Sequence, residues 1–222
     1  MTSTIGSRIN DIKASLPAGV TLVAVSKFHP VEALEEAYAG GQRVFGESRA
    51  NELVAKAGAL PSDIEWHFIG HLQTNKVRTI MPHVTLIHSI DSERLLKLVD
   101  AEAKRINRTV DALLQVHVAR EETKFGFSPE ELNELAASGV IESLTNMRIR
   151  GVMGMASNVD DEERIKDDFR RIAESFADLK RLSTLDSLDT ISMGMSHDYR
   201  LAIDAGSNMV RIGTTIFGER EY

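Results

Sequence analysis

The sequence contains no cysteine among its 222 residues. This absence excludes disulfides, thiolate-bound zinc, iron–sulfur clusters and cysteine nucleophiles, and it favours a cytoplasmic location. An excess of positive charge is also missing. The chain has 26 Lys and Arg but 33 Asp and Glu, which gives a formal net charge of −7. We therefore expect no nucleic-acid partner and no attraction to an anionic membrane surface, so any bound anion must be held by a local site.

Long apolar runs are absent too. No stretch approaches the roughly 18 residues that a membrane helix needs, so the sequence predicts no membrane segment. Near the amino terminus, Ile5, Ile9, Ile12 and Leu16 recur at helical spacing among charged residues. This spacing predicts an amphipathic helix of the mature protein rather than a signal peptide. With 42% hydrophobic residues, the chain can bury a core of its own, and we expect a single domain over residues 1–222.

Short β-rich runs alternate with longer helical runs along the chain. Ser128 before Pro129 is typical of a capping box that begins a helix, and Gly139 is typical of a helix end. Asp91 is the expected cap of the helix after the fourth β-rich run. The runs predicted as strands cover residues 22–27, 44–47, 66–70, 86–90, 112–118, 149–156, 190–195 and 209–217.

Strands separated by helices pair in parallel, and eight such units predict an α/β protein with a closed (β/α)8 TIM barrel. An open, doubly wound sheet is the structural alternative. No Gly-x-Gly-x-x-Gly follows any predicted strand, which disfavours a dinucleotide-binding fold. Active sites of such barrels lie at the carboxyl ends of the strands, so the residues that close each strand are the candidates for function.

Lys27 closes the first predicted strand, which is apolar and partly β-branched. Burial at such a position lowers the pKa of a lysine and leaves more of it as the free amine that attacks an aldehyde. The pattern thus indicates a Schiff-base lysine. The alternative is a lysine whose stem packs on apolar surface while its ammonium reaches solvent.

Ser196, Gly213 and Thr214 follow the last two predicted strands. Phosphate sites in this fold are frequently formed by these two loops, with backbone N–H groups as donors. We therefore predict a phosphate site here. The alternative is that Gly213 only makes a turn and that Ser196 only caps a helix beginning at His197.

Arg211 lies within the last predicted strand, between Val210 and Ile212. If these two neighbours pack against the outer helices, the arginine points into the barrel mouth. A buried charge without a partner is costly, so Arg211 needs an acceptor. A salt bridge with Glu47 and contact with a bound ligand are the two candidates.

The remaining candidates carry less chemistry. His67 lies within a predicted strand and is more typical of a core histidine than of a ligand, and the seven histidines show no metal-binding spacing, so we predict no metal site. Met153, Met155, Met193 and Met195 are expected to fill the core, with a floor beneath a flat aromatic ligand as the alternative. Gln73, Asn75 and Lys76 follow the third predicted strand and are weaker candidates.

Six motifs taken together resemble the pyridoxal phosphate homeostasis protein family, known as YggS or PROSC. The resemblance covers nearly the whole chain. The motifs are Ala-Val-Ser-Lys at 24–27, Phe-Gly-Glu at 45–47, Trp-His-Phe-Ile-Gly-x-Leu-Gln-x-Asn-Lys at 66–76, Lys-x-Gly at 124–126, Ser-x-Gly-Met-Ser-x-Asp at 192–198 and Met-Val-Arg-Ile-Gly-Thr-x-Ile-Phe-Gly at 209–218.

The resemblance implies a fold-type III barrel like the N-terminal domain of alanine racemase, which holds pyridoxal 5′-phosphate (PLP) as an internal aldimine. It implies that Lys27 is the Schiff-base lysine and that Arg211 approaches the pyridine nitrogen. It also implies that Lys124 lies near the cofactor entrance, and we add Met155 to the cofactor site. The phosphate is then expected to bind at Ser196, Gly213 and Thr214.

Two positions depart from the family pattern. Ser48 stands where the family commonly has asparagine, which puts a cofactor contact from that side chain in question. Asn208 stands where the family commonly has threonine. Because Asn208 precedes the last predicted strand, we expect this second departure to matter less.

The chemistry of the site points away from efficient catalysis. PLP promotes carbanion chemistry best when an acid keeps its ring nitrogen protonated, whereas Arg211 only donates a hydrogen bond and weakens the electron sink. Alanine racemases with this arrangement add a tyrosine base from a partner subunit. The tyrosines here are Tyr38, Tyr199 and Tyr222, and Tyr38 falls in the first crossover helix, away from the mouth.

We therefore predict a PLP-binding homeostasis or carrier protein without catalytic residues. Its expected partners are PLP and apo-enzymes that need PLP, and the chain is expected to be a monomer or a weak homodimer. A PLP-dependent amino-acid racemase or lyase is the first alternative. The second is a class I aldolase-type barrel, in which Lys27 forms a Schiff base with a phosphorylated sugar and no cofactor is bound.

Overall fold

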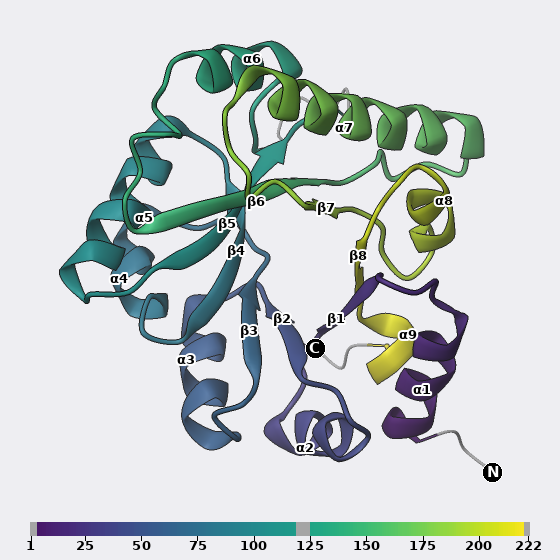
Figure 1. Ribbon diagram of the computed structural model, residues 1–222. Helices are drawn as coiled ribbons and strands as arrows, with labels where there is room; N and C mark the ends of the chain where they lie inside the picture. The colour runs from purple at the N-terminus through teal and green to yellow at the C-terminus, as the bar shows by residue number, and fades with distance from the viewer. Residues whose placement is uncertain (1–3, 119–124, 220–222) are drawn as a thin grey trace.

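The structure is a computed structural model that describes residues 4–118 and 125–219. Eight parallel strands close into a barrel in chain order, and the ring is completed where Thr21 of the first strand pairs with Met209 of the last. This closure confirms the TIM barrel and excludes the open sheet (Figure 1). The strands are β1 (Thr21–Val25), β2 (Val44–Glu47), β3 (Glu65–Phe68), β4 (Val84–Ile90), β5 (Val110–Val116), β6 (Met147–Gly154), β7 (Thr190–Ser192) and β8 (Met209–Ile212).

Helices surround the barrel on its outside (Figure 1). The first and last of them lie side by side, and Arg8 Nε donates a hydrogen bond to the Ile216 carbonyl at 2.5 Å. The helices are α1 (Ile5–Ser15), α2 (Val31–Ala39), α3 (Ala50–Ala59), the 3₁₀ turn η1 (Thr74–Lys76), α4 (Val77–Ile80), α5 (Glu93–Arg105), α6 (Pro129–Ala137), α7 (Glu162–Leu182), α8 (Tyr199–Asp204) and α9 (Thr214–Phe217).

Several predicted boundaries need correction. The last strand ends at Ile212, and residues 214–217 form α9 instead of continuing the strand. A short apolar run does not distinguish a strand from a helical turn by periodicity, which explains the error. Ser92 rather than Asp91 caps α5. The capping box at Ser128 is confirmed, because its side chain and that of Glu131 each accept a backbone N–H of the other residue.

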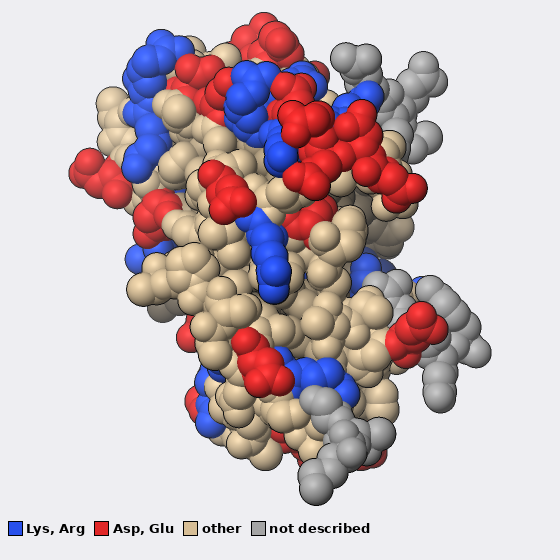
Figure 2. Space-filling view, turned by 90° about the vertical axis from the view of Figure 1, so that its right-hand side faces the viewer, with Lys and Arg blue, Asp and Glu red and all other residues tan. Residues whose placement is uncertain are grey.

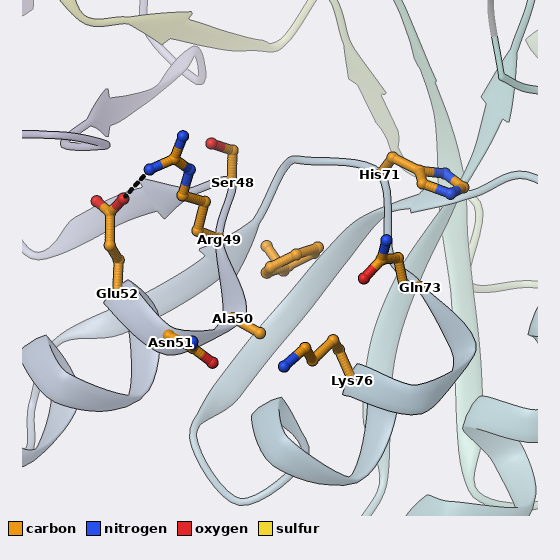
Figure 3. Close-up of a pocket in the computed structure, with 9 residues that line it drawn as sticks. Ser48, Arg49, Ala50, Asn51, Glu52, His71, Gln73 and Lys76 are labelled. Atoms are coloured by element: carbon orange, nitrogen blue, oxygen red, sulfur yellow. Dashed lines mark ion pairs between the residues drawn. The ribbon is translucent and has the colours of Figure 1, made fainter. Parts of the chain in front are cut away.

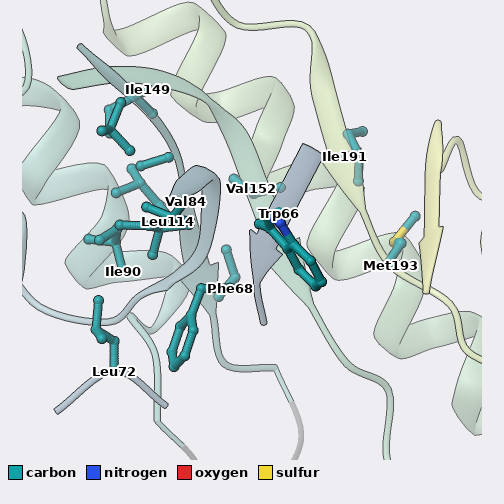
Figure 4. Close-up of a cluster of buried hydrophobic side chains, with 14 of the residues drawn as sticks. Trp66, Phe68, Leu72, Val84, Ile90, Leu114, Ile149, Val152, Ile191 and Met193 are labelled. Atoms are coloured by element: carbon teal, nitrogen blue, oxygen red, sulfur yellow. The ribbon is translucent and has the colours of Figure 1, made fainter. Parts of the chain in front are cut away.

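The strands separate two apolar clusters. Successive residues of a strand point to opposite faces, so one set fills the barrel and the other packs under the helices. The inner cluster is small and is formed by Val23, Leu86, Leu113, Met153 and Met209. The outer cluster is much larger, and Figure 4 shows part of it, including Trp66, Phe68, Leu72 and Ile191.

The surface carries charges of both signs. Figure 2 shows basic and acidic side chains interspersed over the upper part of one face, where α7 lies. Many of them pair along that helix, as Arg170 does with Glu174 at 2.6 Å and Arg181 with Asp178 at 2.9 Å. Within the described ranges, no helix combines the length and apolar character needed to cross a bilayer.

Candidate functional site

A cavity of about 270 Å³ opens at the carboxyl ends of β1 and β8. It brings together every predicted cofactor residue that the structure describes, whereas Lys124 lies outside the described residues. We call this space the Lys27 cavity. Its lining residues are Val25, Lys27, Ile69, Met155, Met195, Ser196, His197, Arg211, Gly213 and Thr214.

The backbone beside Lys27 is held in an uncommon conformation. Phe28, the next residue, has a φ of 68°, in the left-handed region that bulky side chains rarely occupy. Its N–H donates to the Glu52 carboxylate at 2.8 Å, and the Arg49 guanidinium lies 4.4 Å from its ring centroid. Contacts with the beginning of α3 therefore fix the sharp turn that follows Lys27.

A second lysine lies near the first strand, but its ammonium is hydrogen-bonded to three acceptors. Lys56 of α3 is 5% exposed, and its ammonium donates to the Ser26 carbonyl at 2.8 Å, to Glu47 at 2.7 Å and to Glu52 at 3.2 Å. Burial raises the pKa of Glu47, while Lys56 opposes that shift. Because three acceptors hold its amine, Lys56 is a poor candidate for attack on an aldehyde. No local pattern in the sequence predicts this buried pair.

The predicted phosphate residues lie next to one another. The Gly213 N–H donates to the Ser196 hydroxyl at 3.3 Å, which joins the β7–α8 loop to the β8–α9 loop. Helix α8 begins after Asp198, so the alternative role of Ser196 as a cap is wrong. Gly194 has a φ of 96°, and a Cβ there would lie 2.6 Å from the Ala202 Cβ, so the loop that carries Ser196 requires glycine at this position.

Arg211 is 5% exposed and is held by neutral acceptors. Its guanidinium donates to the Ser192 carbonyl and hydroxyl, each at 2.7 Å, and to the Gly154 carbonyl at 3.0 Å. Burial lowers its pKa to about 10, and Asp198 opposes that shift. The salt bridge with Glu47 offered as one alternative is therefore wrong, because Glu47 pairs with Lys56 instead.

The inward position of Arg211 agrees with the predicted alternation. Val210 and Ile212 belong to the outer cluster, and Met209 belongs to the inner one. At neutral pH the guanidinium stays protonated, so at the Lys27 cavity it acts as a hydrogen-bond donor.

The four methionines divide between roles. Met155 and Met195 line the Lys27 cavity, whereas Met153 fills the inner cluster and Met193 the outer one. Core filling is thus confirmed for Met153 and Met193. The two cavity-lining thioethers present polarizable apolar surface of the kind that contacts flat aromatic rings.

A second cavity, of about 430 Å³, lies between the beginning of α3 and the segment that follows β3. Figure 3 shows Lys76 pointing across it toward Ala50 and Asn51. It shares no lining residue with the Lys27 cavity, and it contains Ser48, the first departure from the family pattern. Its lining residues are Ser48, Arg49, Ala50, Asn51, Glu52, Phe68, His71, Gln73 and Lys76.

The second departure has a local structural role. The Asn208 side-chain amide donates to the Asp189 carbonyl at 2.6 Å, and its oxygen accepts the Ile191 N–H at 2.8 Å. Asn208 therefore ties the segment before β8 to β7, away from the Lys27 cavity.

Comparison with known proteins connects these features to a family. A family model described as "Alanine racemase, N-terminal domain" matches residues 2–221. A relative from Aquifex aeolicus (strain VF5), named pyridoxal phosphate homeostasis protein, is 42% identical over 202 residues, which are 90% of this chain and 87% of the relative. A relative of the same name from Escherichia coli (strain K12) is 39% identical over 210 residues, 93% and 88% of the two chains.

Solved structures of similar proteins also match this chain over nearly its whole length. PipY of Synechococcus elongatus PCC7942 without PLP has a TM-score of 0.92 at 36% identity and covers 97% of this chain and 100% of its own. The structure of PipY with PLP bound has a TM-score of 0.88. Alanine racemase from E. faecalis shares the fold at a TM-score of 0.74 and 19% identity, over 97% of this chain and 57% of the racemase. By family model, sequence identity and fold, this chain belongs to the pyridoxal phosphate homeostasis protein family.

Proposed function

We propose that this protein binds PLP through Lys27 and acts in PLP homeostasis without efficient turnover of amino acids. The observation that carries the proposal is that Lys27 and the loops with Ser196 and Gly213 open into one cavity. The names of the relatives and the PLP-bound PipY structure support it.

The residues of the cavity fit three of the polar groups of PLP. The Lys27 amine suits the aldehyde, the hydroxyl groups of Ser196 and Thr214 suit the phosphate, and the Arg211 guanidinium suits the ring nitrogen. A Cβ at Gly213 would lie 3.1 Å from the Val25 carbonyl, so glycine keeps this wall of the cavity open. When bound, PLP supplies an aldehyde that condenses with a lysine amine.

Two features disfavour turnover. Arg211 offers an N–H to the ring nitrogen but no acidic proton, and this weakens the electron withdrawal that carbanion chemistry needs. Among the described residues, the Tyr38 hydroxyl donates to Asp63, the Tyr199 hydroxyl accepts from Arg200, and neither tyrosine lines the Lys27 cavity. The proposal therefore favours a holding role over the racemase or lyase alternative.

The wider assignments follow from the same proposal. Apo-enzymes that need PLP are the proposed recipients, the cytoplasm is the proposed location, and a monomer or weak homodimer is the proposed state. Lys124 keeps its proposed place near the cofactor entrance. Residues 1–222 are proposed to act as one PLP-binding domain without catalytic residues or a metal.

The test is a visible absorption spectrum of the purified chain during addition of PLP. We expect a yellow complex that Lys27→Ala abolishes and that Lys76→Ala, a lysine of the neighbouring cavity, retains. A colourless wild type after PLP addition would refute the proposal and favour the aldolase-type alternative. Rapid deuterium incorporation at the α-carbon of amino acids would favour the racemase or lyase.

A further inference from the structure

A row of buried polar side chains crosses the inside of the barrel. Arg211 Nη1 donates to the Ser192 hydroxyl at 2.7 Å, Ser192 Oγ lies 3.1 Å from His88 Nδ1, and His88 Nε2 lies 3.0 Å from His67 Nδ1. Arg211 lines the Lys27 cavity, whereas His67 lines a cavity at the other end of the barrel. We call these four residues the interior chain.

The interior chain is shielded from solvent. Ser192 and His88 are fully buried, and His67 and Arg211 are 4% and 5% exposed. Removing the partner of a polar group buried to this degree destabilises the folded protein, because water does not replace the lost hydrogen bond. The Ser192 hydroxyl and both ring nitrogens of His88 therefore depend on the other members of the interior chain for these hydrogen bonds.

The donor at one end sets the direction of the hydrogen bonds. A guanidinium only donates, so the Ser192 oxygen accepts from Arg211 and the serine proton is left for His88 Nδ1. The reverse order, with His88 donating to Ser192, would leave the serine proton without an acceptor in a fully buried position. His88 then carries its proton on Nε2 and donates to His67 Nδ1, so His67 also carries its proton on Nε2.

Neither histidine adds a charge to the row. Burial lowers the pKa of His67 to about 3 and lowers the pKa of His88 well below its usual value. The nearby charge of Asp111 opposes the shift of His67, while Arg211 adds to that of His88. The cavity below His67 is also lined by Glu65 and Arg150.

We propose that Ser192, His88 and His67 are positioning residues that hold the Arg211 guanidinium in one orientation and leave it the single cation of the interior chain. The inference rests on the proposed function, in which Arg211 meets the ring nitrogen of PLP. A guanidinium fixed in this way presents one N–H to that nitrogen, and the neutral histidines behind it bring no additional acidic proton. The interior chain thus favours holding the cofactor over electron withdrawal through it.

The first test uses the wild-type protein without PLP. Nitrogen-15 NMR of histidine-labelled protein reports which ring nitrogen carries the proton. We expect Nε2–H tautomers for both His67 and His88, unchanged from pH 8 to pH 5.5. An Nδ1–H tautomer, or titration of either ring near pH 6.5, would overturn the proposal.

The second test measures the rate of PLP release from the loaded protein. Ser192→Ala removes the hydroxyl between Arg211 and His88, and we expect release about tenfold faster, equivalent to about 1.4 kcal/mol. Ser192→Thr keeps a hydroxyl and should restore release to within about twofold of wild type. His83→Asn, a change to a partly exposed histidine outside the interior chain, is the control and should release PLP at the wild-type rate.

The outcomes separate the two proposals. Release from Ser192→Ala within twofold of wild type, at an unchanged melting temperature, would overturn the positioning role. If the wild type takes up no PLP, the proposed function fails, while the NMR result still decides on the interior chain. The NMR arm also keeps the proposal refutable if Ser192→Ala does not fold.

Discussion

At the scale of single residues, the environment of each amine decides its chemistry. Lys27 and Lys56 both lie near the end of β1, but Lys27 lines the cavity with the proposed phosphate residues Ser196, Gly213 and Thr214, and Lys56 does not. The Lys56 ammonium lies in a buried cluster with Glu47, Glu52 and the Ser26 carbonyl. The cavity lining therefore distinguishes the proposed Schiff-base lysine from its neighbour.

Ser196 tests the phosphate assignment. Ser196→Ala removes a hydroxyl that lines the Lys27 cavity and accepts the Gly213 N–H. A hydrogen bond to a charged group contributes about 1.5–3 kcal/mol, so we expect PLP to bind about tenfold more weakly or worse, as measured by fluorescence titration. Thr215→Val, next to Thr214 but outside the cavity lining, is the control. Equal affinity for Ser196→Ala and wild type would contradict the assignment.

Individual site residues were more accessible to sequence reasoning than their partners. Lys27, Ser196 and Gly213 were predictable because strand ends converge at one rim of a parallel barrel. The partner of Arg211 was not, since Ser192 meets it only through the register of β7 against β8. The contact of Ser192 with His88 joins residues 104 positions apart, which no local pattern reveals.

At the scale of elements, a buried ion pair fixes α3 against the barrel. The Lys56 ammonium reaches Glu47 of β2 and the backbone of Ser26, next to Lys27. The Ser26 hydroxyl donates to the same carboxylate at 2.6 Å. This polar cluster ties together β1, β2 and α3 next to Lys27, the proposed Schiff-base residue.

Lys56→Met should destabilise the protein strongly. The substitution leaves the fully buried Glu47 carboxylate without its cation, and breaking a buried pair in this way costs about 3–5 kcal/mol. Urea denaturation at pH 7 measures the free energy of unfolding. The double variant Lys56→Met/Glu47→Gln should recover much of the loss, whereas Lys104→Met, at an exposed position of α5, should change little. A loss below about 1 kcal/mol for Lys56→Met would argue against the role of this pair.

The elements themselves were predictable where the pattern was long. The apolar residues Ile165, Phe169 and Ile172 recur at helical spacing, which predicts α7, and the capping box at Ser128 predicts the beginning of α6. The apolar run after Met209 was not divided correctly, because the single turn of α9 buries Ile216 just as a strand would. Tertiary packing, not local periodicity, decides such short segments.

At the scale of the whole molecule, the barrel contains neutral histidines that an unfolded chain would protonate. Burial depresses the pKa of His67 and of His88 below the usual value of 6.5. Below pH 6.5 the unfolded chain therefore binds more protons than the folded one. The stability that the two neutral histidines contribute is fully present above that pH. It falls as the pH decreases toward their folded-state pKa values.

We expect the free energy of unfolding to decrease by about 2.5 kcal/mol in total between pH 7 and pH 5.5. Each histidine contributes up to about 1.36 kcal/mol per pH unit over the part of this interval in which only the unfolded state is protonated. Urea denaturation at several pH values measures the slope, and salt held constant serves as the control. A free energy of unfolding that is flat or rises on acidification would show that the histidines are not buried in neutral form.

The central claim is that the Lys27 amine forms a covalent bond with PLP. Borohydride reduction of the loaded protein makes that bond permanent, and peptide mass spectrometry then locates it. We expect a single reduced adduct on Lys27, with Lys56 and Lys76 unmodified. An adduct distributed over other lysines, or none on Lys27, would contradict the account.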